Sequence, residues 1–344
     1  AGAGVEFSRA QGGFARILQK QGNNEIEGVL DIGYGSFLPD GSSGLSISAF
    51  DGYRAGLMVS GPIIKDRLWF RISHDWMQHD DLVHATTSLQ AVPTTTSVHS
   101  DRLTWQVSPR NKLSFEIARE DLSMENVGVN SWVGPDSSSS IDSGGSRYAL
   151  TWIVPLSPKV LIETALAYRD RRYETGAHRP DATNTCLQDA ADGLSGSHCL
   201  DLIEYRVSGP AYLMREHDHR RGALKVDATV YGGRWIGAGH QLKFGAVVED
   251  ETFARRMERR STLIRTVHEF EDREILVVRQ AARPLDESQA ETIYWGLYGE
   301  DQIKPASNLA VTIGLRIDRT ELAGQTFTIA DTGLAPFLGI NWDP

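Results

Sequence analysis

Hydrophobic and polar residues alternate along much of this chain with a period of two. In residues 309–318, leucine, valine and isoleucine occupy every second position, and threonine, glycine, arginine and aspartate fill most positions between them. Successive side chains of a β-strand point to opposite faces, so the pattern predicts a strand with one apolar and one polar face. Apolar residues at helical spacing are almost absent, which favours an all-β fold.

The same alternation recurs in about twelve segments of the chain. Many of them run for ~9–11 residues, the length that a tilted strand needs to cross a hydrocarbon core, whereas strands of soluble proteins have about 5–6 residues. In a membrane wall, such strands present apolar side chains to lipid and polar side chains to a lumen. The predicted strands lie near 27–34, 53–61, 67–77, 98–108, 111–121, 147–155, 159–170, 220–232, 240–251, 290–303, 308–320 and 336–342.

Short and long connections alternate between these predicted strands. Short turns are expected at 61–67, 108–112, 155–159, 232–240 and 303–308. Long polar loops are expected at 35–52, 78–97, 122–146, 171–219, 252–289 and 321–335. This order is typical of outer-membrane barrels, which have short periplasmic turns and long extracellular loops. We therefore predict a transmembrane antiparallel β-barrel and exclude a soluble β-solenoid or adhesin.

Composition and charge narrow the function classes. The chain has 344 residues and a formal net charge of −10, so it lacks the basic surface of a nucleic-acid-binding protein. Its mean hydropathy of −0.30 fits an alternating wall, and no stretch approaches the ~20 apolar residues of a spanning helix. The first residues show no signal peptide, so we expect any signal to have been removed or never to have been part of this sequence. Enzyme motifs are absent, and we expect neither catalysis nor a cofactor.

The longest predicted loop contains the residues that are candidates for chemistry. Cys186 and Cys199 are expected to form an extracellular disulfide; free thiols, or a metal site with the adjacent His198, are the alternatives. His217 and His219 would share one face of an extended segment, as two zinc ligands would. Because no third ligand is defined, we interpret this segment as the solvated end of a loop and expect no metal.

Three stretches carry turn residues in a distinctive order. The first, residues 5–28, combines a glycine pair, a lysine and a glycine–asparagine turn: Gly12, Gly13, Lys20, Gly22, Asn23 and Asn24. The second, residues 59–70, contains a turn with Gly61, Pro62, Lys65 and Asp66. The third combines 314–319 with 337–344. Together they resemble the TonB-dependent receptors of the bacterial outer membrane, specifically the Oar-like branch with a carboxypeptidase-regulatory-like N-terminal extension.

The resemblance implies a domain organisation. Residues 1–26 correspond to the end of a plug domain, and residues 27–344 to the N-terminal part of the barrel. Family barrels have about 22 strands, so about ten strands are expected outside this sequence or in another chain. Most of the plug and the TonB box are expected upstream.

The resemblance also implies a function and partners. The function is energy-coupled uptake of a bulky ligand through a plugged barrel in the outer membrane of a Gram-negative bacterium, with the ligand left open. The partners are the TonB energy-transducing system, outer-membrane lipid and lipopolysaccharide. The rival hypothesis is a non-transporting barrel that acts as a surface anchor or as a component of a larger outer-membrane assembly. A surface lipoprotein or another outer-membrane subunit would then be a partner.

Two placements follow from these expectations. The apolar face of 309–318 should meet lipid, while Thr312, Gly314 and Arg316 face the interior. Residues 1–26 should lie inside the barrel or at its periplasmic mouth, hydrogen-bonded to inward-facing polar residues. Those expected on the inner wall are Arg102, Gln106, Glu116, Lys225, Asp227, Lys243, Glu249, Arg316 and Asp318.

Overall fold

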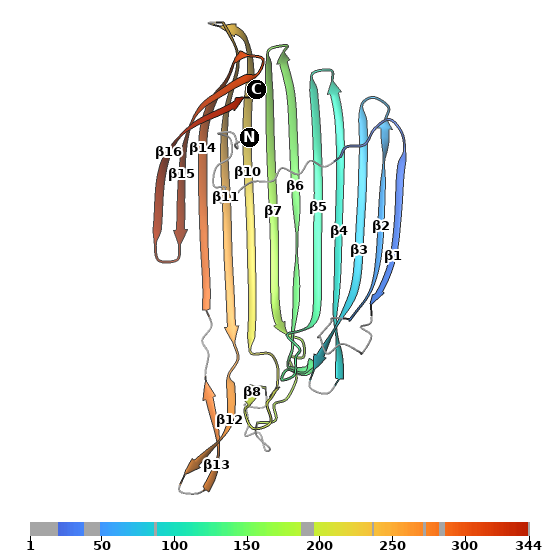
Figure 1. Ribbon diagram of the computed structural model, residues 1–344, viewed down its shortest axis with the longest axis vertical. Helices are drawn as coiled ribbons and strands as arrows, with labels where there is room; N and C mark the ends of the chain where they lie inside the picture. The colour runs from blue at the N-terminus through green and yellow to red at the C-terminus, as the bar shows by residue number, and fades with distance from the viewer. Residues whose placement is uncertain are drawn as a thin grey trace.

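The protein is described by a computed structural model over residues 20–37, 49–85, 88–186, 196–235, 237–270, 273–281 and 286–342. Within these ranges nearly every element is a strand, apart from the 3-10 helix η1 (Pro135–Ser137), and no helix is long and apolar enough to cross a membrane. Twelve strands form one antiparallel sheet, in which each strand pairs with the sheet strands next to it in sequence (Figure 1). The predicted all-β fold and the order of the predicted strands are confirmed.

The strands fall into a large and a small sheet. The large sheet contains β1 (Glu27–Phe37), β2 (Ala49–Ile64), β3 (Leu68–Ala85), β4 (Ser88–Ser108), β5 (Asn111–Val127), β6 (Ser139–Ser157), β7 (Val160–Ala177), β10 (Leu213–Trp235), β11 (Ala238–Arg259), β14 (Asp286–Ala306), β15 (Leu309–Gly324) and β16 (Thr328–Trp342). The small sheet contains β8 (His198–Asp201), β9 (Arg206–Ser208), β12 (Thr262–Phe270) and β13 (Arg273–Ala281).

Most strands of the large sheet are longer than the sequence predicted. β10 has 23 residues and β11 has 22. The long loops expected at 78–97 and 321–335 are wrong, because β3 ends at Ala85 just before β4, and β15 ends at Gly324 just before β16. Strand pairing uses backbone groups and does not require apolar side chains. Polar residues therefore continue the ladder beyond the apolar stretches, and the other predicted long loops are shortened in the same way.

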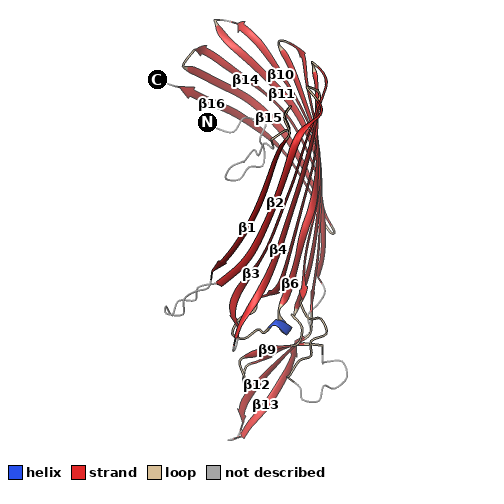
Figure 2. Cartoon of the chain, turned by 90° about the vertical axis from the view of Figure 1, so that its right-hand side faces the viewer, coloured by secondary structure: helices blue, strands red, loops and turns tan. Residues whose placement is uncertain are grey.

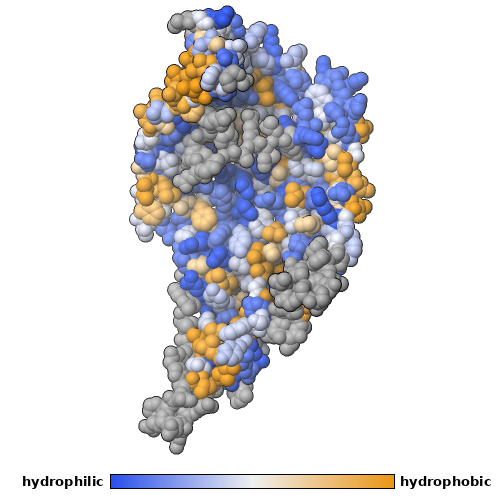
Figure 3. Space-filling view, in the orientation of Figure 1, coloured by the Kyte–Doolittle hydropathy of each residue, from blue (hydrophilic) through white to orange (hydrophobic). Residues whose placement is uncertain are grey.

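The two faces of the large sheet differ in polarity and in crowding. Ile313 is 52% exposed and Leu315 47% on one face, whereas Arg316, on the other face, is only 3% exposed. The sheet is bent (Figure 2), and its hollow side is mainly hydrophilic in the middle (Figure 3). Side chains on a hollow side converge, which explains why polar residues are buried there. The register predicted for 309–318 is confirmed, with Arg316 inward and Ile313 outward.

The outward apolar surface ends at an aromatic pair towards the long-loop end. Tyr148 and Tyr168 are direct cross-strand partners on β6 and β7, with ring centroids 6.4 Å apart. The next outward pair is Ser146 and Asp170, and polar residues follow from there on. Tyrosines are favoured where an apolar surface meets water, because the ring is amphipathic. The strands therefore extend well beyond the apolar surface into a polar environment.

The small sheet lies at the long-loop end of the molecule (Figures 1 and 2). β12 pairs in parallel with β8, and β8 pairs with β9, so the loops that carry them are joined through their backbones. A bridge between Val133 and Val207 adds the loop that follows β5. We call the small sheet and these joined loops the cap. β12 and β13 pair with each other inside the segment 252–289, where the sequence predicts a long polar loop.

The outward position of Ile313 predicts a large penalty for a charge there. In the full-length protein in phospholipid vesicles, Ile313→Arg should lower the free energy of unfolding by about 2–4 kcal/mol, since the guanidinium would face hydrocarbon. Thr312→Arg, which places the same group on the inward face, is the matched control and should cost much less. Equal penalties for the two variants, measured by urea titration, would refute the register.

Candidate functional site

Residues 20–26 lead into β1 and dock on the short turn between β2 and β3. Asn24 is the centre of this contact. Its Oδ1 accepts hydrogen bonds from the Asp66 backbone N–H at 3.0 Å and from Trp69 Nε1 at 2.8 Å, and its Nδ2 donates to Asp66 Oδ1 at 2.5 Å. Asp66 has a positive φ of 61°, a conformation that aspartate and asparagine tolerate better than most residues. One asparagine thus stabilises an otherwise strained turn.

The docked segment approaches the sheet backbone closely. Gly22 is buried, and a Cβ on it would lie 2.3 Å from the Phe70 carbonyl oxygen. Only glycine fits such an approach without a shift of the chain. Gly61 lies against Ile26, whose Cγ1 would be 3.1 Å from an added Cβ. Two stretches that the sequence analysis identified separately, 5–28 and 59–70, are therefore in direct contact; we call this contact the junction.

The other predicted residues of these stretches lie around the junction. Pro62 is the cross-strand partner of Trp69, and Lys65 is exposed in the turn itself. Asn23 bonds within its own segment, to Glu25 N at 2.8 Å and Glu27 Oε1 at 2.6 Å. Lys20 is exposed, while Gly12 and Gly13 lie outside the described residues.

The junction segment also reaches the inner wall. Gln21 Oε1 accepts a hydrogen bond from Lys112 Nζ at 2.7 Å, on the inward side of β5. Two of the inner-wall residues expected to bind residues 1–26 also bind within the wall: Arg102 lies 3.3 Å from Glu116, and Gln106 Nε2 donates to the Ser108 carbonyl at 2.6 Å. Residues 1–19 lie outside the described residues, so their expected contacts stay a prediction. Lys112 was not among the residues expected to bind this segment.

The inner wall of β10, β14 and β15 carries a dense polar network. Tyr298 donates its hydroxyl hydrogen bond to Asp227, and Tyr294 donates to Asp318. Arg316 binds Asp318 through Nε at 2.7 Å and lies 5.1 Å from the centroid of the Tyr298 ring. Burial is tolerated because the charges and hydroxyls hydrogen-bond each other. The network holds these strands together on their lumen side.

A glycine makes room for this network. An added Cβ at Gly245 would lie 2.2 Å from Cζ of Tyr298, so the tyrosine ring occupies the space that a side chain on β11 would need. Sequence alternation identified Asp227, Arg316 and Asp318 as inward-facing, but not their tyrosine partners. The sequence did contain a signal for them. By the alternation of β14, Tyr294 and Tyr298 point to the inner face, and the glycine opposite Tyr298, Gly245, leaves space there for a large side chain.

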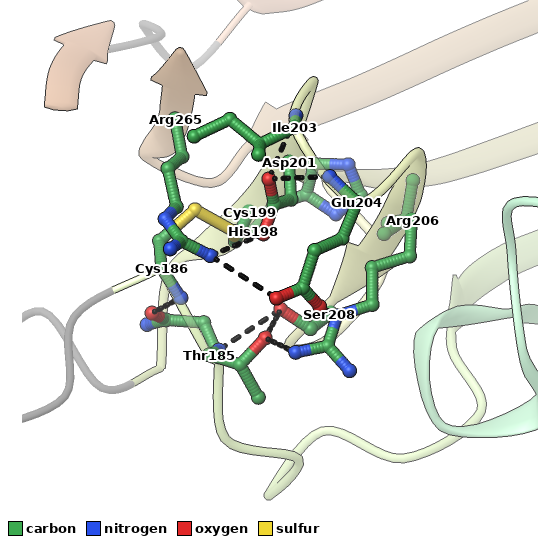
Figure 4. Close-up of a disulfide and its surroundings, with 12 residues drawn as sticks. Thr185, Cys186, His198, Cys199, Asp201, Ile203, Glu204, Arg206, Ser208 and Arg265 are labelled. Atoms are coloured by element: carbon green, nitrogen blue, oxygen red, sulfur yellow. Dashed lines mark hydrogen bonds and ion pairs between the residues drawn. A yellow bond between two sulfur atoms is a disulfide. The ribbon is translucent and has the colours of Figure 1, made fainter. Parts of the chain in front are cut away.

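The cap is closed by the disulfide between Cys186 and Cys199 (Figure 4). Their Cα atoms are 5.9 Å apart, an ordinary separation for a disulfide. Cys199 lies on β8 and faces Leu263 on β12, and the three side chains form a small buried core. The structure thus contains the disulfide expected from the sequence, and neither thiol is free.

A buried ion pair reinforces the cap beside the disulfide. Asp201 is fully buried; it binds Arg265 Nη1 at 2.7 Å and accepts the backbone N–H groups of Ile203 and Glu204 at 3.0 and 3.1 Å (Figure 4). Burial by itself raises the pKa of Asp201, but the hydrogen bonds from Glu204 and Ile203 and the Arg265 guanidinium outweigh it and lower that pKa below its ordinary value.

The interpretation of His217 and His219 as a loop end is wrong, because both lie in β10. Polar residues continue this strand beyond its apolar stretch. His219 Nε2 is 2.7 Å from Glu251 Oε1, and His217 packs between the rings of Tyr173 and Phe253. Throughout the described ranges, no group of three or more histidine, cysteine, aspartate or glutamate side chains could hold a metal ion.

Comparisons with known proteins decide the family. A family model described as TonB dependent receptor-like, beta-barrel matches residues 18–344. The chain belongs to this family. TonB-dependent receptors are transport receptors of the outer membrane rather than enzymes. No curated protein matches the sequence of this TonB-dependent receptor.

Solved receptor structures share its fold. The ferripyoverdine receptor of Pseudomonas aeruginosa has a TM-score of 0.66 and 13% identity, over 95% of this chain and 41% of that receptor. The alcaligin receptor FauA of Bordetella pertussis has a TM-score of 0.60 and 12% identity, over 94% and 42%. The transporter YddB of Escherichia coli also scores 0.60 with 12% identity, over 86% and 36%. This chain therefore spans less than half the length of each.

The junction depends on one side chain that can be removed. In the full-length receptor, Asn24→Ala should lose the two hydrogen bonds to Asp66 and the one to Trp69, and speed amide hydrogen exchange of residues 22–26 by about tenfold, equivalent to ~1.4 kcal/mol. Asn23→Ala is the control, because that side chain bonds only within its own segment. Unchanged exchange in Asn24→Ala would contradict the proposed role of this side chain.

The lowered pKa of Asp201 predicts a pH-dependent stability of the cap. At neutral pH, Asp201→Asn should destabilise the cap by about 1.5–3 kcal/mol, since it weakens a charge-assisted bond to Arg265. A depressed folded-state pKa contributes stability above the unfolded pKa, and that contribution is lost as the pH falls through the folded value. The two proteins should therefore converge in strong acid.

Limited proteolysis of the cap measures this effect, with thermolysin at neutral pH and pepsin in acid. Asp136→Asn is the control, because Asp136 is an exposed carboxylate within η1 that has no ion-pair partner in the described structure. If the difference in cap cleavage rate between wild type and Asp201→Asn stays constant down to strong acid, the ion pair is not its cause.

Proposed function

We propose that this chain is the plug-exit segment and the N-terminal part of the barrel of an energy-coupled transporter, which takes up a bulky ligand with the TonB system. The short turns then face the periplasm and the cap faces the medium. We assign residues 1–26 to the plug and 27–344 to the barrel, and place the receptor in the Oar-like branch. Outer-leaflet lipid and lipopolysaccharide surround the outward face.

The observation that carries this proposal is the junction. The chain enters the sheet through a segment that docks on the β2–β3 turn through Asn24 and reaches the inner wall through the bond between Gln21 and Lys112. A passive pore has no use for a segment held at the mouth of its lumen. A plug that must move needs a fixed point where it meets the barrel, and the junction provides one.

The inner wall supports the same proposal. Its polar pairs, the buried Asp227 with Tyr298 and the exposed Arg54 with Asp75 at 2.8 Å, give a hydrated surface along which a polar plug can be bound and released. Neighbouring structures include a receptor bound to ferripyoverdine and a receptor for alcaligin. We propose uptake of a ligand of comparable bulk, with its identity open.

One observation favours the rival function, a surface anchor or a component of a larger assembly. The cap presents exposed aromatic side chains, with Tyr205 61% exposed and its ring 5.3 Å from Trp132. Such a surface suits a partner protein, including a surface lipoprotein, as well as a ligand. The two functions differ in whether the plug moves when TonB is energised.

Thiol labelling distinguishes the two functions without a known ligand. Cells carry full-length receptor with Asn23→Cys and receive culture supernatant of the native organism as the ligand source. A thiol reagent that reaches the periplasm should label this cysteine several-fold faster in cells with TonB than in cells without it, because pulling on the plug exposes the segment. Equal labelling rates in the two strains would favour the anchor or assembly function.

A further inference from the structure

Positive charge collects at the short turns of the large sheet. The short connections at 61–67, 108–112, 155–159, 232–240 and 303–308 contain seven lysines and arginines and one carboxylate, although the chain as a whole has a net charge of −10. These connections lie at the end of the sheet away from the cap (Figure 1). The basic residues are Lys65, Arg67, Arg110, Lys112, Lys159, Arg234 and Lys304.

Most of these cations have no partner in the protein. Lys112 is bound to Gln21, and the one carboxylate, Asp66, is hydrogen-bonded by Asn24. The side chains of the other basic residues are exposed, and none makes a hydrogen bond or ion pair to another residue in the described ranges. An exposed group of uncompensated cations attracts an anion.

The position of these cations along the strands matches the headgroups of a bilayer. Val107 and Leu156, 44% and 53% exposed, precede Arg110 and Lys159 by three residues each. Three residues of a strand tilted by about 45° advance roughly 7 Å along the membrane normal, and a headgroup layer is roughly 5–8 Å thick. Long basic side chains also extend towards the charged headgroups while their stems lie on apolar surface.

Two tryptophans mark the same level on the outward face. Trp105 on β4 and Trp152 on β6 point outward and are 46% and 42% exposed. Trp152 Nε1 donates a hydrogen bond to Oδ1 of Asn111, the residue after Arg110, at 3.3 Å. Tryptophan is enriched where a membrane meets water. The cations therefore continue the lipid-facing surface at its short-turn end.

We propose that the six cations without a partner bind phospholipids that have a net negative headgroup, in the leaflet at the short turns. We call them the basic rim: Lys65, Arg67, Arg110, Lys159, Arg234 and Lys304. The inference rests on the proposed function only in that the short turns face the periplasm, which makes this leaflet the inner one.

The distribution of the basic rim favours lipid over a protein partner. Every one of the short connections carries at least one of these cations, so the charge follows the wall along its whole length. Lipid surrounds a barrel in the same way, whereas a bound protein segment needs its charges gathered at one or two neighbouring turns. The other end of the outward face differs, because Asp170, Arg172 and Glu174 follow Tyr168 there on β7. We therefore expect the preference for anionic lipid at the short turns alone.

Spin-labelled lipids measure this preference on the full-length receptor in phosphatidylcholine vesicles. The probe is phosphatidylglycerol with a nitroxide on its acyl chain, and phosphatidylcholine with the same label is the neutral comparison. The motionally restricted fraction of each lipid gives its relative association constant. Phosphatidylglycerol should be preferred at least about threefold at low salt, and the preference should vanish at ~1 M salt, where charges are screened within about 3 Å.

Either of two results with the wild-type receptor would overturn the proposal. Equal association of the two lipids would show that the basic rim meets another anionic partner or only solvent. A preference that persists at high salt would show that charge is not its cause.

Paired charge removals locate the preference at the short turns. Arg110→Gln with Lys159→Gln should lower the phosphatidylglycerol preference to about half, and Arg234→Gln with Lys304→Gln tests two other turns independently. Since these side chains have no partner in the described ranges, their removal should leave the fold intact.

The control removes the same charge away from lipid. Arg169→Gln with Arg179→Gln changes one residue on the inward face of β7 and one in the loop after it. This receptor should keep the wild-type preference. An equal fall in the control and in both rim variants would contradict the placement.

The outcome is separate from that of the proposed function, because lipid association in vesicles requires neither TonB nor movement of the plug. A preference that depends on the basic rim, together with TonB-independent labelling of the Asn23→Cys receptor, would sink transport and leave the rim intact. Loss of the preference with TonB-dependent labelling would sink the rim and leave transport intact.

Discussion

The architecture depends on the requirement that every backbone N–H and C=O group within a bilayer be paired inside the protein. An unpaired group costs several kcal/mol in hydrocarbon, so strands can cross only as members of a continuous ladder. Here each strand of the large sheet pairs with the large-sheet strands that precede and follow it in sequence, from β1 to β16, in a single antiparallel order. Since strand side chains alternate, the ladder also fixes two faces for the whole wall: one exposes Ile313, and the other buries Arg316.

The division into two faces places the inner-wall network and the Lys112 contact of the junction on the same side of the sheet. On the inward side, the Tyr298–Asp227 bond ties β14 to β10, and Lys112 meets the segment that enters the sheet. Beyond this wall, at the long-loop end, lies the cap with its disulfide and buried Asp201–Arg265 pair. The junction, the inner wall and the cap thus follow one path through the molecule, from the short turns to the long-loop end.

The sequence predicts the fold well because period-two alternation reports burial directly. It places Arg316 inward and Ile313 outward, and it finds the strands in their observed order. It fails where polar residues continue a strand, as at 78–97 and in β10 around His217, since backbone pairing leaves no periodic apolar signal there. Contacts between distant strands, such as Tyr298 with Asp227 or Asn24 with Trp69, depend on register. The sequence marks Gly22, Asn24 and Asp66 as turn residues without showing that they meet.

The most direct test of the two-faced wall is a spin-label scan along β10 in the full-length receptor in vesicles. A single cysteine is introduced at each position from Leu224 to Thr229 and spin-labelled. The two native cysteines do not react with the label, because Cys186 and Cys199 are bonded to each other. Labels at the even positions should be accessible to oxygen dissolved in lipid, and labels at the odd positions to a water-soluble nickel chelate. Accessibility without a period of two, or with the opposite phase, would contradict the account.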